Sequence, residues 1–246
     1  MELLRTAVHP GFAFMTQYPP ALLALEDGSL WPGVGFGALG ETTGEIVFNT
    51  SLTGYQEILT DPSYHGQIIT MTMPHIGNTG CTPEDDESDR VWAAGLVVRS
   101  LSPVVSNWRA RQSLPDYLAE RGVVAIADVD TRALVRHIRT YGAMRAALSS
   151  ADPDPDHLLT LARAARDMNG LDLAREVTCA EPYAWTEAAN WWEANGQWSM
   201  VNSQLSTANP QSAIRTPQFH VVAYDFGIKR NILRLLAAYG CRVTVV

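Results

Sequence analysis

The sequence predicts an α/β protein in two parts: a β-rich amino-terminal α/β domain, then the start of a second domain with parallel strands. Three observations support this. Short strand patterns separated by Gly, Pro and Asn fill residues 21–99. Helix patterns with capping residues appear only after residue 112. Residues 219–246 form a strand–helix–strand pattern, which implies parallel strands.

Composition excludes several classes of protein. The chain has 246 residues and a net charge of −8, and no basic cluster is evident in its sequence. We therefore expect no nucleic-acid partner. No apolar run reaches the ~18 residues of a membrane span, so we expect no membrane partner. Residues 1–20 lack the pattern of a secretory signal and are predicted to be a loose extension, which favours a cytoplasmic protein.

The three cysteines, Cys81, Cys179 and Cys241, are odd in number and far apart. This spacing predicts neither a disulfide framework nor a metal site, so we expect no metal. None has a neighbouring base or a helix start that would activate a thiolate. We expect reduced, non-catalytic thiols, with Cys81 in a polar loop.

The strands are predicted in order from apolar runs and turn signals. Asp27-Gly28 is a hairpin signal between a strand at 21–26 and a returning strand at 29–31. The glycines that follow at positions 33, 35, 37 and 40 predict a connecting loop. Further strands are expected at 45–49, 66–73, 91–99 and 123–127.

Helix starts follow from capping residues. Ser113 caps a helix that stops at Gly122, and Asp130 caps a helix that runs to about Tyr141. The latter places His137 on a solvated polar side. Asp156 is predicted to cap a third helix that extends to Met168, after the breaker at 152–155.

The carboxyl-terminal third has two different patterns. Residues 190–217 lose periodicity and predict a long linker, in which Trp191, Trp192 and Trp198 can contact either a partner or the chain itself. The strand–helix–strand unit at 219–246 cannot cover both faces of a parallel sheet, so we expect the chain to be a fragment of a longer protein. Its Asp225-Phe226-Gly227 lacks the other kinase motifs and the spacing of a Rossmann nucleotide site.

Residues 50–59 form a short polar segment whose hydroxyls can cap a short helix. From the residues alone, a hairpin or capping role is favoured for Ser51. This segment is part of a set of distinctive motifs: FNTSLTGYQEILTDPSY (48–64), PHIGN (74–78), VAIADVDTR (124–132), NGLDL (169–173), Glu176-Val177 and VVAYDFGIKRNIL (221–233). With these motifs the chain resembles the small, glutamine-hydrolysing subunit of carbamoyl-phosphate synthase from about Ala21 to Val246, with a gap in the linker. The resemblance reverses the preference for Ser51.

The resemblance implies the domain organisation. Residues 21–150 would form the amino-terminal domain of the small subunit, and 151–217 a connecting helix and linker. Residues 218–246 would begin a flavodoxin-like class I glutamine amidotransferase domain, truncated here. In the family, a Cys on a nucleophile elbow and a His-Glu pair hydrolyse L-glutamine. This sequence contains no G-x-C-x-G elbow and no His-x-Glu, so no catalytic residue is expected in it.

The resemblance also implies partners and a binding residue. Ammonia would pass to the large subunit, which makes carbamoyl phosphate for arginine and pyrimidine synthesis. ATP and magnesium are expected on that subunit, and no cofactor in this chain. Ser51 matches the first-domain serine that contacts glutamine in the family. The alternative is a non-catalytic docking module for the large subunit, and a continuation containing the Cys elbow would exclude that alternative.

Overall fold

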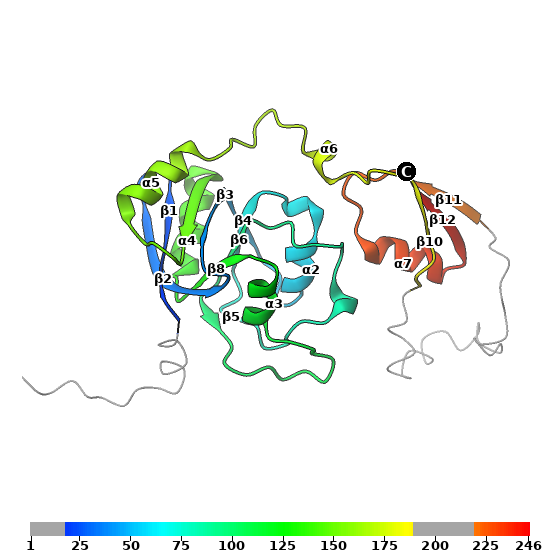
Figure 1. Ribbon diagram of the computed structural model, residues 1–246, viewed down its shortest axis with the longest axis horizontal. Helices are drawn as coiled ribbons and strands as arrows, with labels where there is room; N and C mark the ends of the chain where they lie inside the picture. Colours follow the sequence, from blue (N-terminus) through cyan, green and yellow to red (C-terminus); the bar gives the residue numbers. More distant parts are fainter. Residues whose placement is uncertain (1–17, 189–218) are drawn as a thin grey trace, which may run out of the picture. The chain divides into compact units, whose positions relative to one another are not determined.

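The computed structural model describes residues 18–188 and 219–246. They form two compact units that divide between Leu171 and Asp172. We call them unit 1 and unit 2, and each is described by itself (Figure 1). Of the extension predicted at 1–20, residues 1–17 lie outside the described residues, as do the tryptophans of the predicted linker, and Pro20 begins the first strand. The chain is α/β, as the sequence predicts.

Unit 1 is built on a closed seven-stranded barrel. In order around it lie β1 (Pro20–Leu25), β2 (Leu30–Gly37), β8 (Val124–Ala127), β6 (Gly95–Val97), β4 (Gln67–Met71), β3 (Glu41–Asn49) and β9 (Met144–Ser149). Strands β3, β4, β6 and β8 run parallel to one another. Strand β9 pairs antiparallel with β1 and with β3, which closes the barrel. Closure leaves none of the seven strands with a free edge.

The predicted hairpin is confirmed, but the predicted glycine loop is wrong. Strands β1 and β2 pair antiparallel across the turn at Asp27-Gly28. Gly33 and Gly35 lie inside β2 rather than in a loop. A Cβ on Gly33 would lie 2.3 Å from the carbonyl oxygen of Ala127, and one on Gly35 would lie 2.4 Å from Cβ of Ser150. Glycine is required here because neighbouring chain segments approach too closely for a side chain.

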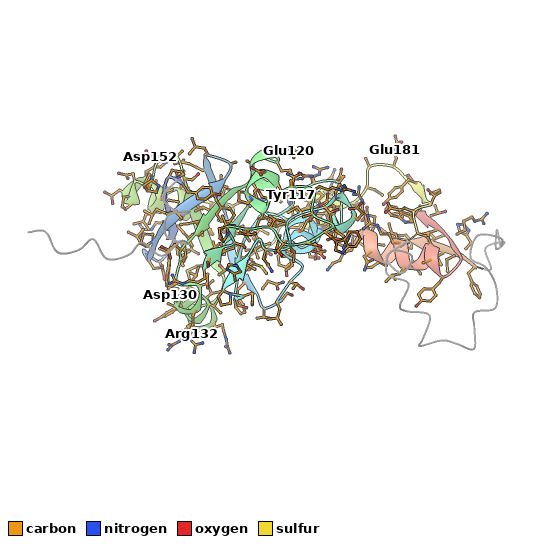
Figure 2. All side chains as sticks on the ribbon, turned by 90° about the horizontal axis from the view of Figure 1, so that it is seen from below. Tyr117, Glu120, Asp130, Arg132, Asp152 and Glu181 are labelled. Carbon is orange, nitrogen blue, oxygen red and sulfur yellow. The ribbon has the colours of Figure 1, made fainter. Side chains whose placement is uncertain are left out.

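Short elements connect the barrel strands. They are α2 (Tyr55–Thr60), η1 (Pro62–Tyr64), β5 (His75–Ile76), η2 (Pro83–Asp85), β7 (Ser100–Leu101), α3 (Leu114–Glu120) and α4 (Thr131–Tyr141), and α5 (Pro155–Ala164) follows the last barrel strand. Strands β5 and β7 form a separate parallel pair. In Figure 2, Tyr117 and Glu120 of α3 lie on the opposite side of unit 1 from Asp130 and Arg132, at the start of α4.

Two of the three predicted caps are confirmed. Ser113 Oγ accepts a hydrogen bond from Asp116 N at 3.3 Å, and Asp130 Oδ1 accepts from Ala133 N at 3.0 Å. The third prediction is wrong, because Asp154 rather than Asp156 caps α5 and the helix ends at Ala164, before Met168. Pro155 takes the first helical position, which shifts the cap by two residues.

The core of unit 1 lies on both faces of the barrel wall. One cluster combines residues of β1, β3, β4, β6, β8 and β9 with Leu134 and Ile138 of α4. A second packs α2 and α3 against the outer face. A third packs Leu158 and Ala162 of α5 against β1 and β9. Helix α5 therefore belongs to unit 1, whereas the sequence analysis ended the first domain at residue 150.

Two other local predictions differ from the structure. The predicted strand at 91–99 is paired only at Gly95–Val97, because the amides of Trp92 and Ala93 bond instead to the carbonyl oxygen of Leu59. His137 is not simply solvated: its Nε2 lies 2.6 Å from Asp27 Oδ2, and its side chain is 22% exposed.

Unit 2 comprises α6 (Leu173–Val177), β10 (Tyr183–Trp185), β11 (Phe219–Ala223), α7 (Arg230–Ala238) and β12 (Cys241–Val245). Strands β11 and β12 are parallel, which confirms the predicted strand–helix–strand unit. Strand β10, which the sequence analysis had assigned to the linker, pairs antiparallel with the other edge of β12. The small core consists of Leu233, Val243 and Val245 with partly buried neighbours.

Candidate functional site

The candidate site lies at the carboxyl ends of the parallel strands of unit 1. Because β3, β4, β6 and β8 are parallel, the segments that follow them meet at one edge of the barrel. Ligands of sheets with parallel strands commonly bind at that edge. The segment that follows β3 is the loop 50–54, which contains Ser51.

Asn49 fixes the start of this loop through both ends of its carboxamide. Asn49 Oδ1 accepts a hydrogen bond from Ser51 N at 2.7 Å, and Nδ2 donates to Tyr64 Oη at 2.8 Å. The carbonyl oxygen of Asn49 also accepts from Thr72 N at 3.0 Å, just after β4. The backbone of Ser51 is therefore held against two neighbouring segments of the motif region.

The side chain of Ser51 is exposed, and its hydroxyl forms no hydrogen bond with any residue that the structure describes. Helix α2 is capped by Gly54, at φ 80°, without a side-chain hydrogen bond. The capping role expected for the hydroxyls of this segment is therefore wrong. An exposed hydroxyl on a fixed backbone can both donate to and accept from a ligand.

The residues that follow in the same motif have structural partners. Tyr55 Oη donates to the carbonyl oxygen of Gly80 at 2.8 Å and accepts from Thr79 Oγ1 at 2.9 Å. Buried Gln56 donates from Nε2 to the carbonyl oxygen of Thr82 at 2.6 Å and accepts at Oε1 from Thr82 N at 2.9 Å. These bonds attach the segment 79–82 to α2. They also satisfy the buried amide of Gln56, which would cost stability if it were unpaired.

A polar network around Asp86 extends this attachment to α3. Asp86 Oδ1 accepts from Gln56 Nε2 at 2.7 Å and from Tyr117 Oη at 2.6 Å. The guanidinium of Arg121 lies 3.8 Å from the centre of the Tyr117 ring. Burial, followed by the hydrogen bond to Asp86, raises the pKa of the Tyr117 hydroxyl. The sequence alone did not reveal this network, because its hydrogen-bonded residues lie up to 31 positions apart in the chain.

Glu57, three residues after the Ser51 loop, is a carboxyl group with a shifted pKa. A Cβ on Gly54 would lie 3.5 Å from Glu57 Oε2. Burial, together with the negative charges of Asp85 and Glu87, raises the pKa of the Glu57 carboxyl, and Arg109 partly opposes this. Arg109 is itself paired with Asp85 at 2.6 Å. The protonated form of Glu57 is therefore favoured in the folded protein relative to an exposed carboxyl.

The cysteines lack the settings of nucleophiles. Cys81 is 1% exposed and packs in the core, so its expected polar loop is wrong. Burial and the nearby Asp86 raise the pKa of the Cys81 thiol to about 12. Burial and Asp225 likewise raise the pKa of Cys179. Both effects oppose thiolate formation, which nucleophilic catalysis requires.

Asp225 has a structural role in unit 2. Its Oδ1 accepts from Gly227 N at 2.8 Å and from Ile228 N at 2.9 Å, which forms the turn between β11 and α7. Its Oδ2 accepts from Cys179 N at 2.9 Å. These bonds use the carboxylate fully, so the Asp-Phe-Gly tripeptide is a turn in this protein.

The described residues contain neither a metal cluster nor a membrane-spanning helix. Within residues 18–188 and 219–246, no three His, Cys, Asp or Glu side chains gather to form a metal site. Among the helices of the described part, none combines the length and the apolar character needed to cross a membrane.

Comparison with known proteins places the chain in a family. The family described as carbamoyl-phosphate synthase small chain, CPSase domain, matches residues 23–148. The carbamoyl phosphate synthase small chain of Thioalkalivibrio sulfidiphilus is 55% identical over 229 residues, covering 93% of this chain and 57% of the relative. That of Pseudomonas aeruginosa is 53% identical over 228 residues, covering 92% and 57%.

A small chain from Thermosynechococcus vestitus is 53% identical over 230 residues, covering 92% of this chain and 56% of the relative. A solved peptidase M28 precursor from Shewanella amazonensis aligns with a TM-score of 0.32 at 11% identity, over 55% of this chain and 35% of that one, too weakly to indicate a shared fold. This chain thus spans little more than half the length of its curated relatives. It belongs to the carbamoyl-phosphate synthase small-chain family.

Proposed function

We propose that this chain is part of the glutamine-hydrolysing subunit of carbamoyl-phosphate synthase and that Ser51 binds L-glutamine. Family membership supports the reaction class. The observation that carries the site is the exposed, unpaired hydroxyl of Ser51 among the described residues, on a backbone that Asn49 holds in place. A preorganised hydroxyl binds a polar ligand with less loss of conformational entropy than a mobile one.

The division of labour follows from the chemistry. In the proposed reaction a thiolate attacks the side-chain amide of glutamine, ammonia leaves, and water hydrolyses the thioester. The sequence contains no G-x-C-x-G elbow, and the pKa values of Cys81 and Cys179 are raised. We assign the thiolate and its base to a flavodoxin-like amidotransferase domain that unit 2 begins, and substrate binding to unit 1. The large chain would receive ammonia and bind ATP and magnesium.

The test replaces Ser51 in the complete small chain, assembled with its large chain. The α-carboxylate or α-ammonium of glutamine is the expected contact, and both are remote from the reacting amide. Loss of this contact weakens binding of the substrate and of the transition state equally. Ser51→Ala is therefore expected to raise KM for glutamine roughly two- to hundred-fold. Synthesis from free ammonia bypasses the glutamine site and is expected to stay unchanged.

Ser63→Ala is the matched control, because Ser63 is an exposed serine of the same motif. Steady-state kinetics with glutamine and with ammonia give the two readouts. An unaltered glutamine KM in Ser51→Ala, or equal losses with both nitrogen donors, would show that Ser51 does not bind substrate.

The second candidate function is a docking module that binds the large chain without taking part in glutamine hydrolysis. The raised pKa values of the Cys81 and Cys179 thiols support it, because they oppose nucleophilic attack by these residues. Isothermal titration of L-glutamine into this chain bound to the large chain separates the two functions. If the complex binds glutamine and Ser51→Ala weakens that binding, Ser51 belongs to a substrate site. If the complex forms but does not bind glutamine, the chain acts in docking alone.

A further inference from the structure

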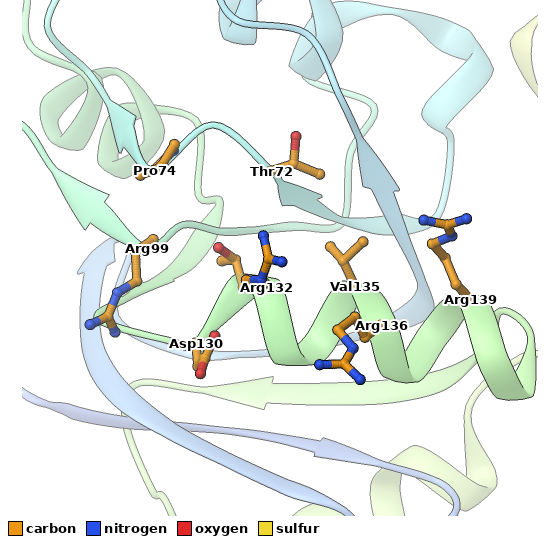
Figure 3. Close-up of a pocket in the computed structure, with 9 residues that line it drawn as sticks. Thr72, Pro74, Arg99, Asp130, Arg132, Val135, Arg136 and Arg139 are labelled. Carbon is orange, nitrogen blue, oxygen red and sulfur yellow. The ribbon is translucent and has the colours of Figure 1, made fainter.

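A groove of about 520 Å³ lies at the same edge of the barrel, beside α4. Its walls come from the segments that follow β4, β6 and β8, and four arginines line it: Arg99, Arg132, Arg136 and Arg139. Figure 3 shows the side chains of Arg132, Val135 and Arg139 along one side of α4, facing the strand segment that carries Thr72. The sequence analysis expected no basic cluster, and this groove corrects that expectation.

Three of these arginines have no counter-charge. Arg99 is 3.4 Å from Asp128 Oδ1, but no described residue forms a hydrogen bond or ion pair with the guanidinium of Arg132, Arg136 or Arg139. The only carboxylate that lines the groove, Asp130, accepts the capping bond from Ala133 N. Helix α4 itself contains no acidic residue. The groove therefore keeps a positive charge in a chain whose net charge is −8.

The charges of Arg132 and Arg136 do not serve the stability of α4, whereas Arg139 lies in its last turn, where a cation is favourable. Arg132 and Arg136 are four residues apart, a spacing at which like charges destabilise a helix. Leu134 and Ile138, on the apolar side of α4, already pack this helix against the core. An arrangement that costs stability and remains exposed points to a ligand that neutralises it.

We propose that this groove docks an acidic segment of the carbamoyl-phosphate synthase large chain, with Arg132 and Arg139 pairing with its carboxylates. Guanidinium groups bind carboxylates through two parallel hydrogen bonds. Val135 and Pro74 give the groove an apolar surface between the charges, as protein interfaces require. The groove is far larger than a single bound ion, and the negative net charge opposes nucleic-acid binding. This inference rests on the proposed function.

The test measures the affinity of this chain for the large chain of the same organism by isothermal titration calorimetry. The double variant Arg132→Glu/Arg139→Glu is compared with Arg111→Glu/Arg175→Glu, which changes the net charge equally at exposed arginines outside the groove. We expect the groove variant to weaken binding at least tenfold and the control by less than twofold. Added salt is expected to weaken wild-type binding more than that of the groove variant.

Each other outcome overturns a defined claim. If the wild-type chain does not bind the large chain, the proposed partnership and the docking site both fail. If it binds and the groove variant binds equally well, or if the control loses as much, only the docking site fails. Heparin binding that depends on Arg132 and Arg139, with unchanged affinity for the large chain, would reassign the groove to polyanions. Thermal melting of each variant verifies that it is folded.

Discussion

Units 1 and 2 use similar apolar strands but protect them differently. In unit 1, each barrel strand has a neighbour on both sides, and residues such as Leu23, Ile126 and Leu148 are fully buried. Among the described residues of unit 2, only β12 lies between two strands, and β10 and β11 are edges. The two units therefore differ in whether the sheet closes on itself, and not in the kinds of residue in their strands.

Exposure of large apolar side chains shows the consequence. In unit 2, Phe219 is 66% exposed, Tyr224 73% and Phe226 71%. Helix α7 contributes Leu233 to the core on one face of the sheet. No residue in the described part of unit 2 covers these exposed side chains. Strands in a parallel sheet are normally covered on both faces, so unit 2 is expected to depend on further contacts for its stability.

The largest effect expected from this comparison is in the barrel interior. Leu148→Ala truncates a fully buried side chain of β9, the strand that closes the barrel by pairing with β1 and β3. We expect a loss of about 2–5 kcal/mol in the free energy of unfolding of unit 1. The exposed Val222→Ala of unit 2 is expected to change stability by less than about 0.5 kcal/mol. Urea denaturation of each variant measures both, and equal losses would contradict the comparison.

Hydrogen exchange of the unaltered chain tests the same comparison without a mutation. Local opening free energies follow the density of buried contacts. We expect the amides of β12 to exchange at least about a hundredfold faster than those of β8, a difference of about 2.7 kcal/mol. Equal protection of the two strands would show that unit 2 is covered by other parts of the chain.

Local signals in the sequence predicted local structure well. The caps Ser113 and Asp130 were correct because a cap bonds only two or three residues along the chain. The parallel pairing of β11 and β12 followed from the helix between them. The cap of α5 is Asp154 rather than the predicted Asp156, because Pro155, which the sequence analysis included in a breaker, takes the first helical position.

Long-range features could not be predicted from one sequence. Barrel closure depends on β9 meeting β1 more than a hundred residues away, and His137 meets Asp27 at a separation of 110. The glycines of β2 are explained only by the carbonyl and side chain that approach them. At the candidate site, Ser51 was selected by resemblance. The arginine groove combines segments that follow three different strands, and periodicity in α4 alone does not reveal it.

The smallest expected effect concerns Glu57, which opposes the stability of unit 1 at neutral pH. Burial raises the pKa of its carboxyl above the ordinary value of 4.5. The folded state therefore binds this proton more tightly than the unfolded state does. Stability is lost as pH rises from about the ordinary value through the raised one, and the penalty is constant above that window.

Glu57→Gln removes this charge and retains a similar shape. We expect it to raise the Tm of unit 1 at pH 7, with the gain shrinking as pH falls through the raised pKa toward 4.5 and vanishing below 4.5, where both side chains are neutral. The control is Glu120→Gln, because the Glu120 side chain is 68% exposed, and its Tm is expected to be nearly unchanged. Scanning calorimetry at several pH values measures the difference. A gain that does not depend on pH would mean that packing, rather than the buried charge, separates Glu57 from Gln.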